Sequence, residues 1–214
     1  MKTSVVLCFV AMAAAASADF ATNQFMDTVL TDMRFEVTRN GLDPLRATPF
    51  YFKVKGNGIT NRDLKANFTQ GSIVGLAGLV RAGDCAYGTS GGLMMMGCYL
   101  SLRGVKVNMN ADVKGDSLIG STHAIATSTL VGPTTFALLE VRGQRGFPAQ
   151  FHAITVPAVT LNTTVVQGNL ELNESRFKEF VSLTHQQLSS QLVTALVGRY
   201  ALILPTVLSR RMMP

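Results

Sequence analysis

The stretch over residues 173–208 constrains this chain most, because it has the pattern of a long amphipathic helix. Its apolar residues recur three or four positions apart, as on one face of a helix, and the other face is polar. Asn173 can cap the first turn, and Pro205 is expected to close the last one. An amphipathic helix depends on tertiary packing for its stability. The residues before it are therefore expected to cover its apolar face.

A second amphipathic helix is predicted over residues 20–40, near the start of the chain. Met26, Leu30 and Met33 fall on one face at helical spacing, and Gly41 is a natural left-handed stop. The chain is thus expected to begin and end with a long helix.

The residues between these helices prefer strands. The clearest signal lies over 105–113, where apolar side chains alternate with polar ones. Further strands are predicted over 50–54, 73–80, 93–102, 118–130, 136–141 and 151–166. Helix, strands, then helix is the order of an α+β protein, and glycines inside the strands permit sharp bending. We expect one strongly curved antiparallel sheet wrapped around the N-terminal and C-terminal helices.

The first eighteen residues are predicted to be a secretory signal peptide. Lys2 precedes an apolar run, and Ala16, Ser17 and Ala18 match the small-residue site of a signal peptidase. Cleavage would leave residues 19–214 as a single domain, and the loss of Lys2 would lower the net charge from +6 to +5. The protein is therefore expected to be extracellular.

Two cysteines remain after cleavage, Cys85 and Cys98. An even cysteine count in an oxidising compartment predicts one disulfide. Asn67, Asn162 and Asn173 each begin an Asn-x-Ser/Thr sequence, so the chain is also predicted to be a glycoprotein.

The composition narrows the class of partner. The chain is 47% hydrophobic and 15% charged, which is more apolar side chain than a compact core needs. Arg199 interrupts the best candidate for a membrane span, so none is predicted. Lys and Arg are scattered along the chain, which disfavours nucleic acid, but transient attraction to an anionic membrane surface is compatible with the charge.

One short motif raises the question of catalysis. Residues 115–118, Gly-Asp-Ser-Leu, match the opening block of a family of serine esterases, in which a histidine and an acid must assist the serine. Asp116 is the last aspartate of the chain, so His123, His152 and His185 lack the Asp-x-x-His pairing of those enzymes. We interpret the motif as a turn and expect no enzymatic activity. The spacing of the histidines predicts no metal, and no cofactor is expected.

Residues 75–84, Gly-Leu-Ala-Gly-Leu-Val-Arg-Ala-Gly-Asp, follow a Gly-Leu-Asp-Pro turn at 41–44 and precede strands and a terminal helix. In these features the chain resembles the mite group 7 allergens, an arthropod family. That family is similar in fold to the tubular lipid-binding proteins, which include the bactericidal/permeability-increasing and juvenile-hormone-binding proteins. The resemblance implies a curled antiparallel sheet around long helices and an apolar pocket, and it brings no catalytic motif.

Methionines at 94–96, in a predicted strand, accompany those of the first helix. Flexible, polarizable side chains suit a pocket for variable apolar ligands. We therefore predict a non-enzymatic binder or carrier of a hydrophobic small molecule or lipid. The predicted lining residues are Met26, Leu30, Met33, Met109, Phe177, Val181, Leu188 and Leu192.

A second hypothesis has the same helices and strands enclosing a solid core. The protein would then recognise a microbial lipid head group or a protein partner through its surface. An enclosed volume would favour the carrier, whereas a filled core with an exposed apolar patch would favour surface recognition.

Overall fold

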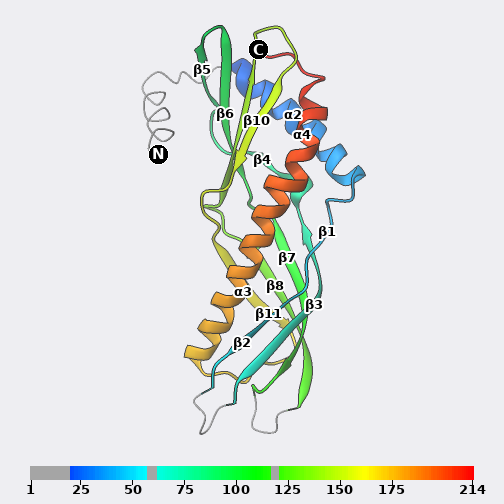
Figure 1. The fold of residues 1–214 in the computed structure, drawn as a ribbon, viewed down its shortest axis with the longest axis vertical. Coiled ribbons are helices and arrows are strands. Elements are labelled where there is room, and N and C mark those ends of the chain that lie inside the picture. Colours follow the sequence, from blue (N-terminus) through cyan, green and yellow to red (C-terminus); the bar gives the residue numbers. More distant parts are fainter. Residues whose placement is uncertain (1–19, 57–61, 117–120) are drawn as a thin grey trace.

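The computed structural model describes residues 20–56, 62–116 and 121–214, so the predicted signal peptide lies outside the described residues. Helix α2 occupies Phe20–Arg39, close to the range that the sequence predicts. The C-terminal helix consists of α3 (Glu174–Thr194), a π-helical segment η2 (Ala195–Tyr200) and α4 (Ala201–Leu208). Pro205 lies inside α4, so the expectation that it closes the helix is wrong. Figure 1 shows this helix running along most of the molecule.

The strands form two antiparallel sheets, which confirms the α+β class. The six-stranded sheet has the order β1-β3-β7-β8-β11, with β2 paired to β3; the five-stranded sheet has the order β10-β9-β6-β4, with β5 paired to β6. In Figure 1 the first sheet lies in the lower half and the second in the upper half. The strands are β1 (Leu45–Arg46), β2 (Phe50–Val54), β3 (Leu64–Val74), β4 (Val80–Arg81), β5 (Ala86–Ser90), β6 (Leu93–Ser101), β7 (Lys106–Lys114), β8 (Thr122–Val131), β9 (Phe136–Gly143), β10 (Gln150–Thr155) and β11 (Leu161–Gln167).

The prediction of a single sheet is wrong, because two tight turns divide the strands between two sheets. β6 passes into β7 through Gly104, whose φ of 94° only glycine adopts readily, and β8 passes into β9 through Gly132 and Pro133. The turns are joined by hydrogen bonds, including Leu102 N to Thr135 O at 3.2 Å. Each turn sends one strand into each sheet.

Two predicted strands are also divided. The range 73–80 contains the end of β3, a 3₁₀ turn η1 (Leu76–Gly78) and the start of β4. Gly75 and Ala77 donate backbone hydrogen bonds to the carboxylate of Asp43, which holds the chain in this turn. The range 151–166 contains β10 and β11, which belong to different sheets, and Pro157 between them has no N–H to donate to a ladder.

The two long helices pack against different parts of the fold. α2 contacts α4, η1 and β4, whereas α3 contacts β2 and β11. Residues Glu174–Leu208 are long and apolar enough to cross a membrane by length and composition, yet 44% of the window that meets this test is buried inside the protein. Leu192, Leu196 and Leu204 are completely buried, so packing against the core accounts for part of the apolar character of this helix, while Leu202 is exposed.

The predicted disulfide is confirmed. Cys85 and Cys98 are bonded, and their Cα atoms lie 4.4 Å apart. The bond joins the start of β5 to β6, and the adjacent Ala86 pairs with Gly97 across the two strands.

Candidate functional site

The buried face of the six-stranded sheet changes character from one strand to the next. On β7 it presents Val107, Met109, Ala111 and Val113, which follow the alternation that the sequence shows. The facing register places Thr129 of β8 opposite Val107, with Thr127 opposite Met109, and β11 adds Thr163 opposite Thr129. The buried face is therefore apolar at its centre and rich in threonine toward β11.

Helix α3 lies against this face. Asn173 caps the helix by accepting a hydrogen bond from Arg176 N at 3.0 Å. Residues spaced four apart form its buried stripe, and a flanking row is only partly buried. The buried residues are Arg176, Phe180, Thr184, Leu188 and Leu192, and the flanking row is Phe177, Val181 and His185.

Aromatic rings fill the space between the first turns of α3 and strands β2 and β3. Phe50 stacks on Phe68 with ring centroids 4.3 Å apart, and Phe180 meets Phe52 edge to face at 5.5 Å. Phe180 is completely buried, whereas Phe177, which stacks on it at 6.3 Å, is 37% exposed. The aromatic cluster, Phe50, Phe52, Phe68, Phe177 and Phe180, thus extends from the core to the surface.

A short polar chain crosses from α3 to β8. His185 Nε2 lies 3.1 Å from Thr163 Oγ1, and Thr163 shares a 2.7 Å hydrogen bond with Thr129. Burial lowers the pKa of His185 from its ordinary value of 6.5 by penalising the charged ring. A neutral imidazole can both donate and accept, so this chain offers a hydrogen-bond partner beside half-buried apolar side chains.

The boundary between α3 and β11 is only partly buried. Half-buried apolar side chains follow it, where they pack against the core without being covered by it. We call this boundary the seam; its residues are Leu161, Thr163, Val165, Val181 and His185.

A polar cluster lies at the start of α3. Buried Asp116 has Oδ2 3.3 Å from His123 Nε2, so the structure gives His123 an acidic neighbour that the sequence spacing does not indicate. Arg176 donates to the carbonyl of Arg62 at 2.6 Å.

Ser117, the serine of the esterase-like motif, lies outside the described residues. Among the described residues, no group of three or more metal-binding side chains comes together.

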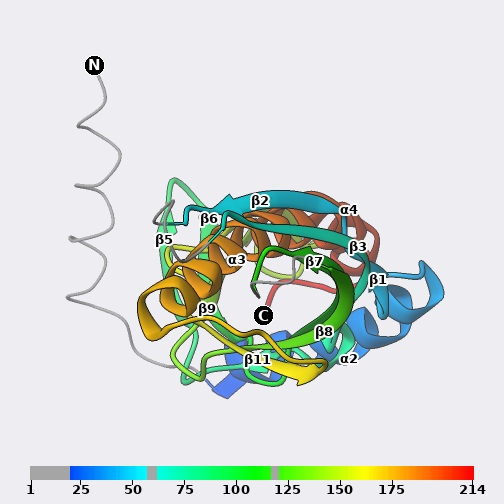
Figure 2. The ribbon, with the colours of Figure 1, turned by 90° about the horizontal axis from the view of Figure 1, so that it is seen from below.

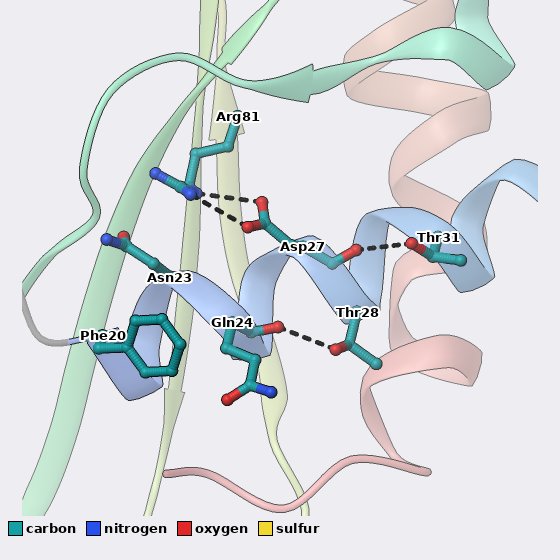
Figure 3. Close-up of a pocket in the computed structure, with 7 residues that line it drawn as sticks. All are labelled: Phe20, Asn23, Gln24, Asp27, Thr28, Thr31 and Arg81. Carbon is teal, nitrogen blue, oxygen red and sulfur yellow. Dashed lines mark hydrogen bonds and ion pairs between the residues drawn. The ribbon is translucent and has the colours of Figure 1, made fainter.

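A surface pocket of about 460 Å³ lies on α2, and Figure 3 shows the residues that line it. Arg81 donates to both carboxylate oxygens of Asp27, at 3.1 and 3.0 Å. Asn23 of α2 donates to Asp84 at 2.8 Å and accepts from Cys85 N at 2.9 Å. The Arg-x-Gly-Asp residues of the sequence motif therefore attach their loop to α2.

Two further pockets open elsewhere. One of about 360 Å³ lies between the start of α2 and residues 211–214. The other, of about 290 Å³, lies between β1, the start of β2, and the end of α3 with η2.

The predicted lining residues fall into two separate regions. Met26, Leu30 and Met33 are buried on α2, which packs against α4 and the upper part of the fold. The other five, Met109, Phe177, Val181, Leu188 and Leu192, lie on β7 and α3. A ligand role for any of the eight stays a prediction. Asn67, Asn162 and Asn173 are all exposed, and their glycosylation also stays a prediction.

Sequence reasoning missed Thr129, Thr163 and His185, which the fold brings together. The threonines sit at alternating strand positions, and His185 follows Val181 by one helical turn. The spacing of these residues matches that of their buried neighbours and could have indicated a buried position. Their polar residue types instead favoured a position facing solvent.

The fold and this region together define an α+β protein with two antiparallel sheets and a long C-terminal helix that contacts the six-stranded sheet through α3 and the five-stranded sheet through η2 and α4. No family model matches the chain. A sequence relative is the "Salivary anticoagulant protein P23" of Ixodes scapularis, which is 29% identical over 209 residues, covering 95% of this chain and 93% of that protein.

Two solved structures are similar to this one. A lipopolysaccharide binding protein aligns over 89% of this chain with a TM-score of 0.49 and 12% identity, and the chain spans 37% of the length of that protein. Takeout 1 of Epiphyas postvittana aligns over 90% of both chains with a TM-score of 0.36 and 15% identity. The resemblance to mite group 7 allergens stays a prediction.

Proposed function

We propose that this chain is a secreted, non-enzymatic binder of a hydrophobic small molecule or lipid, held between α3 and the buried face of the six-stranded sheet. The observation that carries the proposal is the seam, where half-buried apolar side chains border a hydrogen-bonded polar chain. Apolar pockets with a few placed polar groups are typical of small-molecule sites. Removing apolar ligand surface from water there would contribute roughly 25 cal/mol per Å².

Helix α3 contacts strands near both edges of the six-stranded sheet, and these contacts support a sheet that bends around the helix. β11 ends the strand order on one side, and β2 pairs with β3 near the other side, yet α3 contacts both strands. Figure 2, seen along the molecule, places α3 across from β8. We propose that Met109, Phe177, Val181, Leu188 and Leu192 line the ligand site on this side, and that the α2 residues stabilise the upper core.

The absence of tryptophan from the chain allows a direct test. Val181→Trp places a fluorophore at the seam, and Val197→Trp, on the exposed side of η2, is the matched control. At 1.5 Å rise per residue the two positions are about 24 Å apart along the helix. A brominated fatty alcohol, which quenches by contact, is expected to quench Val181→Trp and spare Val197→Trp. Equal quenching, or binding of no apolar probe in native mass spectrometry, would refute the proposal.

Surface recognition is the second candidate, and exposed apolar side chains on the helices favour it. Phe20 is 79% exposed, Phe35 70% and Leu202 77%. These would contact a lipid head-group region or a protein partner. Loss of binding to anionic vesicles in Phe35→Ser and Leu202→Ser, with apolar probe uptake absent in the parent protein, would favour this candidate over the carrier.

A further inference from the structure

The pocket between β1 and η2 has an unusual balance of charge. Arg46, on β1, and Arg199, in η2, both line it, although they lie far apart in the chain. Neither arginine makes a hydrogen bond or ion pair with another side chain in the described part of the chain, and none of the lining residues is acidic. A guanidinium stays charged at any physiological pH. The pocket therefore presents positive charge without a local counter-charge.

The walls of this pocket are fixed. Gln191 Oε1 accepts from Thr48 N at 2.8 Å, and Gln191 Nε2 donates to Thr48 O at 2.8 Å. This pair of hydrogen bonds attaches the segment between β1 and β2 to α3. Arg199 lies in the π-helical segment. This conformation is rare in proteins, and where it occurs it is often at a functional site.

The other side of the pocket is apolar. Phe50 and Ile73 are among its lining residues. Phe50 also belongs to the aromatic cluster, since its ring stacks on Phe68. The pocket thus places two cationic side chains beside an aromatic wall that continues into the aromatic cluster.

We propose that this pocket receives the anionic head, a carboxylate or phosphate, of an amphiphilic ligand whose apolar part lies against Phe50. Arginine donates to the oxygens of both groups in a fixed fork geometry. The inference rests on the proposed function and narrows its ligand class from any apolar compound to an anionic amphiphile.

Dodecanoate and dodecanol test the proposal, because they share an alkyl chain and differ in head-group charge. The affinity of each compound is measured by displacement of a neutral fluorescent probe, from the parent protein and from the double variant Arg46→Gln/Arg199→Gln. We expect dodecanoate to bind the parent about tenfold more tightly than dodecanol, equivalent to about 1.4 kcal/mol. The double variant is expected to lose this preference while its affinity for dodecanol stays the same.

The matched control is Arg142→Gln/Arg145→Gln, which removes the same charge from exposed positions at the other sheet. It is expected to bind both compounds like the parent. Equal dodecanoate affinity in the parent and the Arg46/Arg199 variant would overturn the inference while dodecanol binding upheld the carrier. Failure of both compounds to bind would instead refute the proposed function. Inorganic phosphate tests the remaining source: saturation of the pocket by phosphate, with dodecanoate binding unaffected, would identify a free-anion site and overturn the amphiphile assignment.

Discussion

Phe180→Ala tests whether the aromatic cluster borders a ligand site. Phe180 is completely buried, and its ring lies 5.5 Å from that of Phe52, 6.1 Å from that of Phe68 and 6.3 Å from that of Phe177. The substitution removes the ring that joins α3 to the sheet and leaves a void among three others.

The expected cost is set by burial. Truncating a buried phenylalanine to alanine lowers the free energy of unfolding by about 3–5 kcal/mol, through lost transfer energy and the cavity left behind. The loss of each ring-to-ring contact adds to this cost, because aromatic pairs stabilise the fold by more than their buried area alone. For a domain of this size, each kcal/mol lowers Tm by about 2–4 °C, so a fall of about 6–20 °C is expected in thermal unfolding.

An apolar ligand distinguishes a binding region from an ordinary core. If the void joins the ligand site, an added neutral probe will bind the folded state of Phe180→Ala and raise its Tm in proportion to saturation. The control is Phe25→Ala, which truncates a buried phenylalanine on α2. The reasoning is refuted if Phe180→Ala loses less than about 1 kcal/mol, or if the probe raises the Tm of both variants equally.

Three further changes test individual contacts. Gly71→Ala is expected to cost about 1–3 kcal/mol of unfolding free energy in urea, since its Cβ would lie 2.5 Å from Asn108 O, a backbone atom; an unchanged midpoint would contradict this. Because burial lowers the pKa of His185, its contribution to stability is full above about pH 6.5 and is lost as pH falls toward the lower folded value. Tm should therefore fall less between pH 7.5 and 5.5 in His185→Gln than in the parent, and parallel curves would exclude the effect. Replacing Cys85 and Cys98 by alanine removes a disulfide that joins residues 13 positions apart and should lower the free energy of unfolding by about 3 kcal/mol. Equal stability of the reduced and oxidised parent protein would contradict this.

Local periodicity accounts for what could be predicted from the sequence. The repeat that places Phe180, Leu188 and Leu192 on one stripe arises from the geometry of a single helix, so it needs no knowledge of the partner. The alternation on β7 is likewise a property of one strand, and it correctly indicates which of its side chains are buried. The disulfide followed from cysteine count and the expected compartment.

The division into two sheets could not be obtained in this way. Continuous apolar patterns suggest a single curved sheet, but the turns at Gly104 and Gly132 direct consecutive strands into different ladders. Which strands pair depends on contacts between distant parts of the chain. Internal glycines indicated bending, but they did not indicate which of them would divide a sheet.

The candidate site was harder to predict than the fold because its polar residues contradict the simple pattern. Thr129 and Thr163 are buried yet polar, and each satisfies the other across neighbouring strands. Arg46 and Arg199 line one pocket only because the fold brings β1 and the C-terminal helix together. Residue type alone favours a solvated surface for the two threonines, and only the strand register shows that they are buried.

One buried stripe runs along the C-terminal helix, and the side chains that flank it are more exposed. Leu192, Leu196 and Leu204 are completely covered, so this end is anchored by packing. Phe180 and Leu188 extend the same buried stripe toward the start, whereas the flanking Val181 is half-buried and Phe177 partly exposed, so fewer buried contacts lie on this flank. On the proposed function, a ligand would therefore enter along the flank of α3 while the buried stripe preserves the fold. The Arg199 pocket lies beside the same helix, where the proposed ligand would place its anionic head near Arg46 and Arg199 and its apolar part against Phe50.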